Sequence, residues 1–182
     1  MNPIETQRTI FRLYTPADKD SLTGLLTNAE VMRYVDKGVM SAEAAEQLWT
    51  RLMTVSYPSG VDTIWAVYET EGGEYLGNAS IRPRPEKPDE WEIGYILRPA
   101  AWGRGIASEI ALALTHYGFE RLGLEEVFAT VDIENLPSRR VLEKAGLTLF
   151  REEADEQGAY YLYRVVRSDF YARHSSFEHV FC

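Results

Sequence analysis

Residues 91–123, WEIGYILRPAAWGRGIASEIALALTHYGFERLG, connect a strand pattern to a helix pattern through a turn rich in glycine. Large apolar side chains alternate with other residues from Trp91 to Leu97, which predicts a strand with one buried face. Apolar residues then recur at helical spacing from Ile106 to Arg121, and Gly123 is well placed to end this helix in the left-handed conformation. This strand, turn and helix decide the fold.

The turn between strand and helix lacks bulky side chains at Gly103, Gly105 and Ala107. A helix N-terminus has about four free backbone N–H groups and a partial positive charge, so bare backbone before it can receive a phosphate group. Arg104 adds a counter-charge, and the stretch 98–108 contains no acid. The turn is therefore a candidate pyrophosphate site. The alternative, that the glycines only make a tight turn, stays open.

Two other nucleotide motifs fit this turn poorly. A Walker A loop needs Gly-Lys followed by Ser or Thr, which is absent, and the dinucleotide fingerprint needs a glycine or alanine where Ser108 stands. The dinucleotide fold also needs an acid at the end of the next strand, whereas Glu125 and Glu126 come before that strand. Both motifs are therefore set aside.

The remainder of the chain predicts short alternating elements without internal repeats. After Ser41 as a helix N-cap, Ala44, Ala45, Leu48 and Leu52 share one helical face. Along the chain we expect a strand at 9–14, helices at 16–28 and 42–56, strands at 63–69 and 74–82, a loop at 83–90, a strand at 127–131, a helix at 137–145 and two strands around a turn at 155–158. This order predicts a mixed α/β domain.

Composition narrows the class of protein. The 182 residues suit one domain, and the formal charge of −9 disfavours a nucleic-acid surface and makes a cationic partner the better match. No apolar run approaches the roughly 18 residues that span a bilayer, and the first residues resemble no secretory signal, so we expect a cytoplasmic protein without a membrane partner. The single cysteine, Cys182, has no partner for a disulfide.

Residues 92–147 resemble the central motifs of the GNAT N-acetyltransferase superfamily. Within it, the start ETQRTIFRLYTPAD (residues 5–18) and the tail YYLYRVVRSDF (residues 160–170) are similar to the branch that contains the Rim-type ribosomal-protein N-terminal acetyltransferases. The family's CoA signature is Gln or Arg, two residues, Gly, one residue, then Gly or Ala. Trp102 occupies its first position, which removes a polar contact, while Gly105 and Ala107 match.

The resemblance implies acetyl-CoA as co-substrate and a single domain, 1–182, with a CoA-binding core at about 91–147 and an unassigned tail at about 171–182. It implies a mostly antiparallel sheet of six to seven strands with about four helices, splayed between residues 91–97 and 127–131 to admit the pantetheine arm. The residues implied for CoA are Ile96, Leu97, Arg98, Gly103, Arg104, Gly105, Ile106, Ala107, Ser108 and Asn135.

The resemblance also implies catalytic groups. Glu92 is the first candidate for the base that deprotonates the amine, with Asp132 and Glu134 as alternatives, and a solvated surface carboxylate is the plain alternative for Glu92. Ser138 is the candidate proton donor to the departing thiolate, although Asn135 and Ser138 also suit helix capping. Leu142 stands where many family members carry a tyrosine acid. His116 has no second ligand at metal spacing, so we expect no metal.

The acceptor is a primary amine, which must be neutral to attack a thioester. Deprotonation at pH 7 costs about 4.6 kcal/mol for a lysine-like amine but about 1 kcal/mol for an α-amine, because their pKa values lie near 10.4 and 7.7. A protein N-terminus is therefore one candidate acceptor. A polyamine, amino acid or aminoglycoside is the alternative, as is a silent CoA-binding module in a different class. We expect a monomer or homodimer.

Overall fold

A computed structural model describes residues 4–35, 38–60, 63–85, 87–156 and 158–174. One sheet contains eight strands in the order β1-β2-β3-β4-β5-β6-β8-β7. The strands are β1 Ile4–Glu5, β2 Thr9–Leu13, β3 Thr63–Glu69, β4 Tyr75–Arg84, β5 Lys87–Leu97, β6 Glu126–Asp132, β7 Thr148–Asp155 and β8 Gly158–Val166. The helices are α1 Lys19–Leu26, α2 Ala42–Arg51, α3 Tyr57–Ser59, α4 Ile106–Arg121, α5 Leu136–Lys144 and α6 Arg167–Arg173, with short helical turns η1 Pro16–Asp18, η2 Val31–Tyr34, η3 Leu52–Ser56 and η4 Pro99–Ala101.

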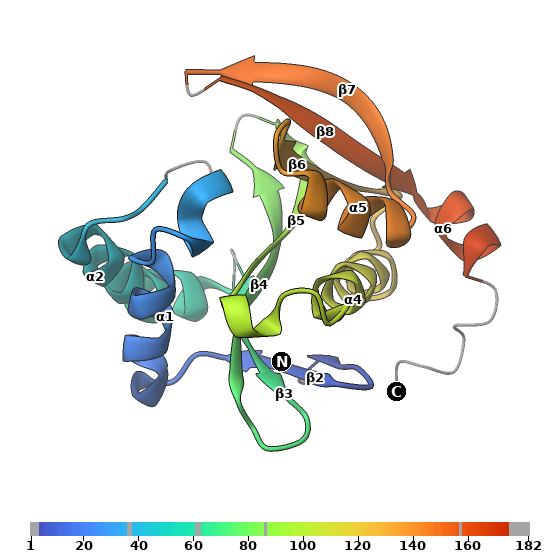
Figure 1. The fold of residues 1–182 in the computed structure, drawn as a ribbon. Coiled ribbons are helices and arrows are strands. Elements are labelled where there is room, and N and C mark those ends of the chain that lie inside the picture. The colour runs from blue at the N-terminus through green and yellow to red at the C-terminus, as the bar shows by residue number, and fades with distance from the viewer. Residues whose placement is uncertain (1–3, 36–37, 61–62, 86, 157, 175–182) are drawn as a thin grey trace.

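The predicted fold class is confirmed, and the predicted counts are slightly low. The sheet is antiparallel except between β5 and β6 (Figure 1). The additional strand is β1, a two-residue element that pairs Ile4 with Phe11 and is too short to give a sequence pattern. The additional helices are the single turn α3 and the C-terminal α6, which begins at Arg167 directly after β8.

The stretch 83–90 is a hairpin rather than the predicted loop. Pro83 pairs with Trp91 and Arg84 with Lys87, so residues 88–90 of β5 have no partner in the β4 ladder. Proline lacks an N–H donor, but strands tolerate it at irregular positions and at edges. The register indeed shifts between Pro83 and Arg84. The prolines therefore loosen the ladder without ending the strands.

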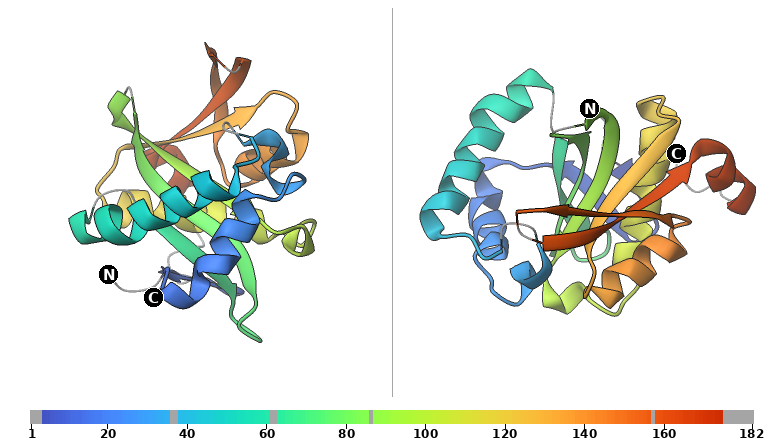
Figure 2. Two further views of the ribbon diagram at one scale, coloured as in Figure 1. Left: turned by 90° about the vertical axis from the view of Figure 1, so that its left-hand side faces the viewer. Right: turned by 90° about the horizontal axis from the view of Figure 1, so that it is seen from above.

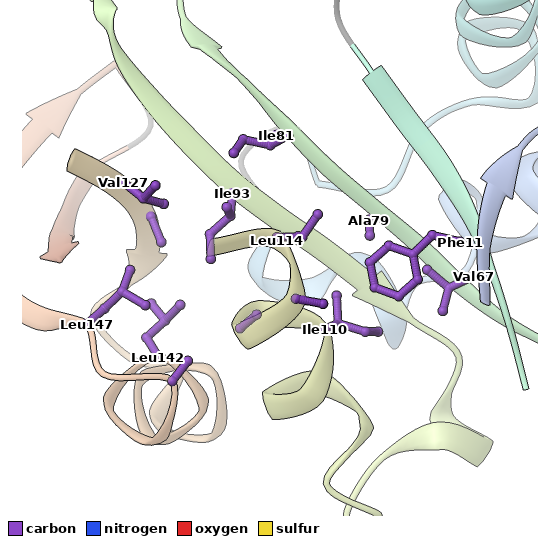
Figure 3. Packing of buried hydrophobic residues seen from close by; sticks show 14 of the residues in the cluster. Phe11, Val67, Ala79, Ile81, Ile93, Ile110, Leu114, Val127, Leu142 and Leu147 are labelled. Carbon is purple, nitrogen blue, oxygen red and sulfur yellow. The ribbon is translucent and has the colours of Figure 1, made fainter. Parts of the chain in front are cut away.

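Two hydrophobic cores lie on opposite faces of the sheet. Figure 2 shows the sheet from above, with α1 and α2 on one side and α4 and α5 on the other. Ile110 and Leu114 of α4 pack against the sheet around Ile93 (Figure 3). On the other face, Trp49 is buried and Ala44 is exposed, so the predicted face of α2 was wrong at Ala44. The buried face is formed by Ala45, Trp49 and Leu52, which recur at helical spacing, and Ala44 lies beside it.

The sheet is nearly divided between β5 and β6. Their ladder consists of the single pair Glu92–Phe128, whereas β5 pairs with β4 up to Leu97 and β6 pairs with β8 up to Asp132. Beyond Glu92 the two strands diverge. The sheet therefore has the splay that the resemblance implied.

The chain after β8 is partly described. Phe170 of α6 is buried against Phe119 of α4, with ring centroids 5.4 Å apart. Tyr171 to Arg173, expected to begin an unassigned tail, therefore complete a packed helix. Phe177, Phe181 and Cys182 lie outside the described residues.

Candidate active site

The glycine turn has a backbone that requires glycine at two positions. Gly103 and Gly105 have φ angles of +71° and +79°, in the left-handed region that other residues rarely adopt. Gly105 is also the N-cap of α4, and its carbonyl accepts the first helical hydrogen bond, from the N–H of Glu109 at 3.2 Å. The turn is thus tight, and it also delivers the chain directly into a helix.

No side chain caps the start of α4. The N–H groups of Ile106, Ala107 and Ser108 precede the first helical hydrogen bond, so they have no partner within the helix. A phosphate oxygen is the kind of acceptor that fits such donors. The predicted CoA residues of this turn therefore form a suitable cradle.

The arginines beside this cradle have carboxylate partners that the local sequence does not contain. Arg104 forms an ion pair with Glu69, and Arg98 lies 3.5 Å from Glu74. Both carboxylates come from the β3–β4 hairpin, and both arginine side chains stay more than two fifths exposed. Residues 98–108 contain no acid, but in the folded chain the two arginines of this stretch pair with carboxylates from another segment. Their guanidinium groups are still accessible.

Arg8 is a further cation at the turn. It comes from the β1–β2 connection, donates to the carbonyl of Arg104 at 2.8 Å and pairs with Glu109 at 2.7 Å. Glu109 lies in the first turn of α4, where its negative charge would oppose a phosphate. Arg8 therefore neutralises an acid beside the cradle.

Trp102 contributes structure rather than the usual Gln or Arg contact. Its indole Nε1 donates to the carbonyl of Leu97 at 2.8 Å, which ties the turn to the end of β5. The ring is 45% exposed, an unusual degree for tryptophan. Trp102 therefore holds the turn in place through a local hydrogen bond.

The opposite wall of the splay is the start of α5. Asn135 caps this helix, since its Oδ1 accepts from the N–H of Ser138 at 3.1 Å. The hydroxyl of Ser138 does not cap the helix but lies 2.7 Å from the hydroxyl of Tyr95 on β5. Helix capping therefore explains the position of the Asn135 side-chain oxygen, but it does not explain the position of the Ser138 hydroxyl.

Glu92 lies at the point where β5 and β6 last pair. Its carboxylate is 3.6 Å from Arg82, 4.0 Å from Arg84 and 3.5 Å from Thr130, and its side chain is 15% exposed. Glu92 is therefore a charge-paired carboxylate at the apex of the splay, not a solvated one.

Glu92 belongs to a larger group of charges that connects β4 and β5 with β7. We call it the charge network; among the described residues it comprises Arg82, Arg84, Lys87, Glu90, Glu92, Arg151 and Glu153. Burial would raise the pKa of Glu153, but hydrogen bonds from Arg84, Lys87, Arg151 and Tyr160 outweigh burial and hold that pKa well below its usual range. Glu153 therefore stays ionised at neutral pH.

The alternative bases lie in less suitable places. The Oδ1 of Asp132 accepts from the backbone N–H of Glu134 at 2.7 Å, so this acid stabilises the turn before α5.

Leu142 is buried in the core, and His116 contacts the Tyr171 ring. Within the described ranges, no cluster of three or more His, Cys, Asp or Glu residues could hold a metal ion.

A cavity of about 480 Å³ lies beside this site and shares Arg98 with it. It is bounded by α1, the Asn28 region and the end of β5 at Arg98 and Pro99, on the face that carries α1 and α2. Neither Glu92 nor Ser138 lines it. The splay, not this cavity, brings the candidate groups together.

Sequence reasoning missed Tyr95, Arg8 and Arg84. Tyr95 was visible as a large residue of the alternating strand, and its facing partner on α5 was not. Arg8 and Arg84 are far along the chain from Glu109 and Glu153, their partners. Only the fold brings these groups together.

Comparisons with known proteins place the chain in a family. A family model described as acetyltransferase (GNAT) domain matches residues 8–148. The chain belongs to the GNAT acetyltransferase family. The uncharacterized N-acetyltransferase YoaA of Bacillus subtilis is 32% identical over 145 residues, which cover 79% of this chain and 81% of YoaA. This GNAT protein is therefore an acetyl-CoA-dependent N-acetyltransferase.

Solved structures share the fold at low sequence identity. A GNAT-family acetyltransferase from Bacillus anthracis superposes with a TM-score of 0.77 at 24% identity, covering 92% of this chain and 99% of that chain. RimL, a ribosomal-protein α-N-acetyltransferase solved with coenzyme A, gives 0.73 at 17%, with 91% and 98% covered. Spermidine N-acetyltransferase from Vibrio cholerae, solved with CoA and spermine, gives 0.75 at 16%, with 89% and 97% covered. These structures establish the fold and leave the acceptor open.

None of the helices in the described part of the chain is long and apolar enough to cross a bilayer.

Proposed function

We propose that this GNAT protein transfers acetyl from acetyl-CoA directly to a primary amine, and that a protein N-terminal α-amine is the acceptor. The observation that carries the proposal is the splay between β5 and β6, which places the uncapped start of α4 and the hydroxyl of Ser138 on either side of one opening. Glu92 stands at its apex. This arrangement supports a site in which a cofactor seat, a base and a proton donor would act together.

The CoA seat follows from the two edges of the splay. The N–H groups of Ile106, Ala107 and Ser108 would receive the pyrophosphate, with Arg98, Arg104 and the bare backbone of Gly103 and Gly105 around it. The open edge of β5 at Ile96 and Leu97 would pair with the pantetheine arm like a neighbouring strand. Asn135 keeps its amide N–H groups for the arm, since no described residue accepts from them while its oxygen caps α5.

Glu92 is the proposed base. Its carboxylate lies 3.6 Å from Arg82 and 4.0 Å from Arg84, at the apex of the splay. An α-amine, whose deprotonation at pH 7 costs about 1 kcal/mol, demands less of a base than a lysine-like amine, which costs about 4.6 kcal/mol. The lower cost of deprotonation therefore favours a protein N-terminus.

The charge network also favours this acceptor over a polyamine. Its four cationic side chains, from Arg82, Arg84, Lys87 and Arg151, outnumber its three carboxylates. A polycation binds best where carboxylates lack such partners. The net charge of −9 for the whole chain therefore does not describe the surroundings of Glu92. The expectation of a cationic partner, which came from that net charge, does not apply to the apex of the splay.

Ser138 is the proposed proton donor to the CoA sulfur. Its hydroxyl faces the splay from the first turn of α5, and its backbone is fixed by Asn135. CoA leaves as a thiolate whose conjugate acid has a pKa near 8.5, so protonation assists the departure and is not obligatory. We therefore expect a moderate loss of rate, not a dead enzyme, without Ser138.

The test is acetyl transfer to a panel of matched amines. CoA release is measured with peptides that carry a free N-terminus, the same peptides with a blocked N-terminus, spermidine, free amino acids and an aminoglycoside, and mass spectrometry locates the acetyl group. We expect efficient transfer to free α-amines and loss of transfer on blocking. Efficient acetylation of spermidine or the aminoglycoside with no acetylation of any peptide would overturn the proposed acceptor.

A further inference from the structure

The contact between Tyr95 and Ser138 is not used in the proton transfers proposed for Glu92 and Ser138. The hydroxyls of Tyr95 and Ser138 lie 2.7 Å apart, which is a direct hydrogen bond between β5 and α5. The contact crosses the splay, where the backbones of β5 and β6 pair only at Glu92 and Phe128. A side-chain bridge thus spans the walls just where the backbone ladder has ended.

The direction of this hydrogen bond follows from the chemistry of the two groups. A phenol is more acidic than an aliphatic hydroxyl and its oxygen is a weaker acceptor, so Tyr95 is the better donor and Ser138 the better acceptor. When Ser138 accepts from Tyr95, the serine's own proton must point elsewhere. Burial raises the pKa of Tyr95 to about 12 against the opposing effect of the Ser138 hydrogen bond, so the phenol keeps its proton through neutral pH.

The bridge also restricts the serine. The N–H of Ser138 donates to Asn135 at 3.1 Å, which fixes its backbone, and the Tyr95 hydroxyl fixes the rotation of its side chain. A hydroxyl with one oxygen lone pair already occupied has few remaining orientations for its proton. The helix α5 itself contains no tyrosine, and the phenol that contacts Ser138 comes from β5.

We propose that Tyr95 is a positioning residue for acyl transfer: it donates to Ser138 and directs the serine proton toward the departing CoA sulfur. This inference rests on the role of Ser138 proposed above. When the C–S bond of the tetrahedral adduct breaks, its electron pair goes to sulfur, the Ser138 proton moves to that sulfur and the Tyr95 proton moves to the serine oxygen. A proton from water then restores Tyr95, and the proton lost by the amine leaves through Glu92 to water, so charge and protons balance.

The structural alternative is that the bridge only fastens β5 to α5. Tyr163 provides the matched control, because it too extends from a strand, β8, to α5, where its hydroxyl donates to Glu143 at 3.1 Å. Its ring is buried like a core residue, and Glu143 is on a later turn of the helix than Ser138. The same hydroxyl accepts from Arg139 of α5 at 3.5 Å. Tyr163→Phe therefore removes strand-to-helix hydrogen bonds without removing a contact of the Ser138 hydroxyl.

The experiment compares Tyr95→Phe, Ser138→Ala, the double variant and Tyr163→Phe for kcat, KM for acetyl-CoA and Tm. We expect Ser138→Ala to lower kcat about 30-fold and Tyr95→Phe about 10-fold, below the usual range for proton-transfer groups because CoA is a good leaving group. The double variant should be no slower than Ser138→Ala, since Tyr95 acts through Ser138. Ser138→Thr should retain most of the rate, and Tyr163→Phe should lower Tm with unchanged kcat.

The outcomes separate the inference from the function on which it rests. If Ser138→Ala is slow but the losses of Tyr95→Phe and Ser138→Ala multiply, or if Tyr95→Phe lowers only Tm, the positioning role is overturned and the proposed function stands. If Ser138→Ala keeps the full kcat, the donor role of Ser138 fails and the inference fails with it. If the parent enzyme acetylates no peptide, the proposed acceptor fails, and the four variants are then compared on whichever amine is acetylated.

Because the pKa of Tyr95 is about 12, the phenol donates throughout the range from pH 7 to pH 10. The ratio of kcat between the parent enzyme and Tyr95→Phe should therefore stay constant over that range. A ratio that falls to one between pH 7 and pH 9 would show that the phenol has lost its proton there, which contradicts the proposed role.

Discussion

The two helices that border the splay begin in opposite ways. The helix α4 begins after Gly105, a residue with φ +79° that has no side chain and leaves the first N–H groups without a cap. The helix α5 begins after Asn135, whose side chain occupies the N–H of Ser138. Both starts face the same opening, but only one keeps its backbone donors available.

This difference assigns separate tasks to the two walls. The uncapped start of α4 forgoes a cap worth about 1 kcal/mol, a loss that a bound phosphate group can recover. The capped start of α5 holds Ser138 in a fixed position, as acid catalysis requires. Under the proposed function, the wall with the free donors would bind CoA, and the wall with the fixed hydroxyl would protonate the CoA sulfur.

The largest expected effect comes from forcing a side chain onto the start of α4. Gly105→Val places a β-branched residue at φ +79°, which costs about 1–2 kcal/mol in strain unless the turn rearranges. Rearrangement would turn the N–H groups away from the phosphate, so we expect the Kd for CoA to rise about 100-fold, the loss of one or two charge-assisted hydrogen bonds. Isothermal titration calorimetry with CoA measures this change.

The control lies at the other end of the same helix. Gly123 has a φ of +66° and open space around it, so Gly123→Val introduces similar strain far from the splay. We expect both variants to lose Tm to a similar extent and only Gly105→Val to lose CoA affinity. Equal CoA affinity in the two variants would show that the phosphate seat is not at the start of α4.

A smaller effect separates the two roles of Asn135. Aspartate caps a helix as well as asparagine does but lacks the amide N–H groups, so Asn135→Asp should keep the parent Tm and raise KM for acetyl-CoA about 10-fold. Asn135→Ala loses the cap as well, at about 1 kcal/mol of the free energy of unfolding. Thermal unfolding and initial rates on both variants give the comparison. An unchanged KM for acetyl-CoA in Asn135→Asp would show that Asn135 caps the helix and does not bind the cofactor.

The sequence predicted well those features of the helix starts that depend on neighbouring residues. Gly103 and Gly105 stand out because their backbone conformation excludes most residues, and Ser41 and Asn135 stand out because capping uses few residue types. Such features depend on residues within about one helical turn of one another. They could be recognised without knowing how the chain folds.

The missing parts are contacts between distant segments. Arg8 reaches Glu109, Glu69 reaches Arg104 and Tyr95 reaches Ser138, each across the sheet or between its layers. A charged or phenolic side chain gives no sign in the sequence of which partner it will meet, because the register of the sheet decides this. The splay itself was implied only by the resemblance to GNAT proteins, since strand patterns do not reveal where a ladder ends.

The smallest expected effect tests the neutralised acid at the start of α4. Arg8→Ala removes the arginine partner of the Glu109 carboxylate beside the proposed phosphate seat, so we expect KM for acetyl-CoA to rise about threefold while stability changes by less than about 1 kcal/mol, as is usual for a partly exposed ion pair. The double variant Arg8→Ala/Glu109→Gln removes the charge and should regain most of the affinity.

Arg167 provides the matched control, because it pairs with Glu120 at the C-terminal end of α4 at 2.9 Å and is about as exposed as Arg8. Arg167→Ala should leave KM unchanged, and added salt should reduce the Arg8→Ala effect, since the repulsion is electrostatic. If Arg8→Ala and the double variant raise KM equally, Arg8 acts through the backbone carbonyl of Arg104 instead. The difference between the two helix starts would then depend on the shape of the turn and not on its charge.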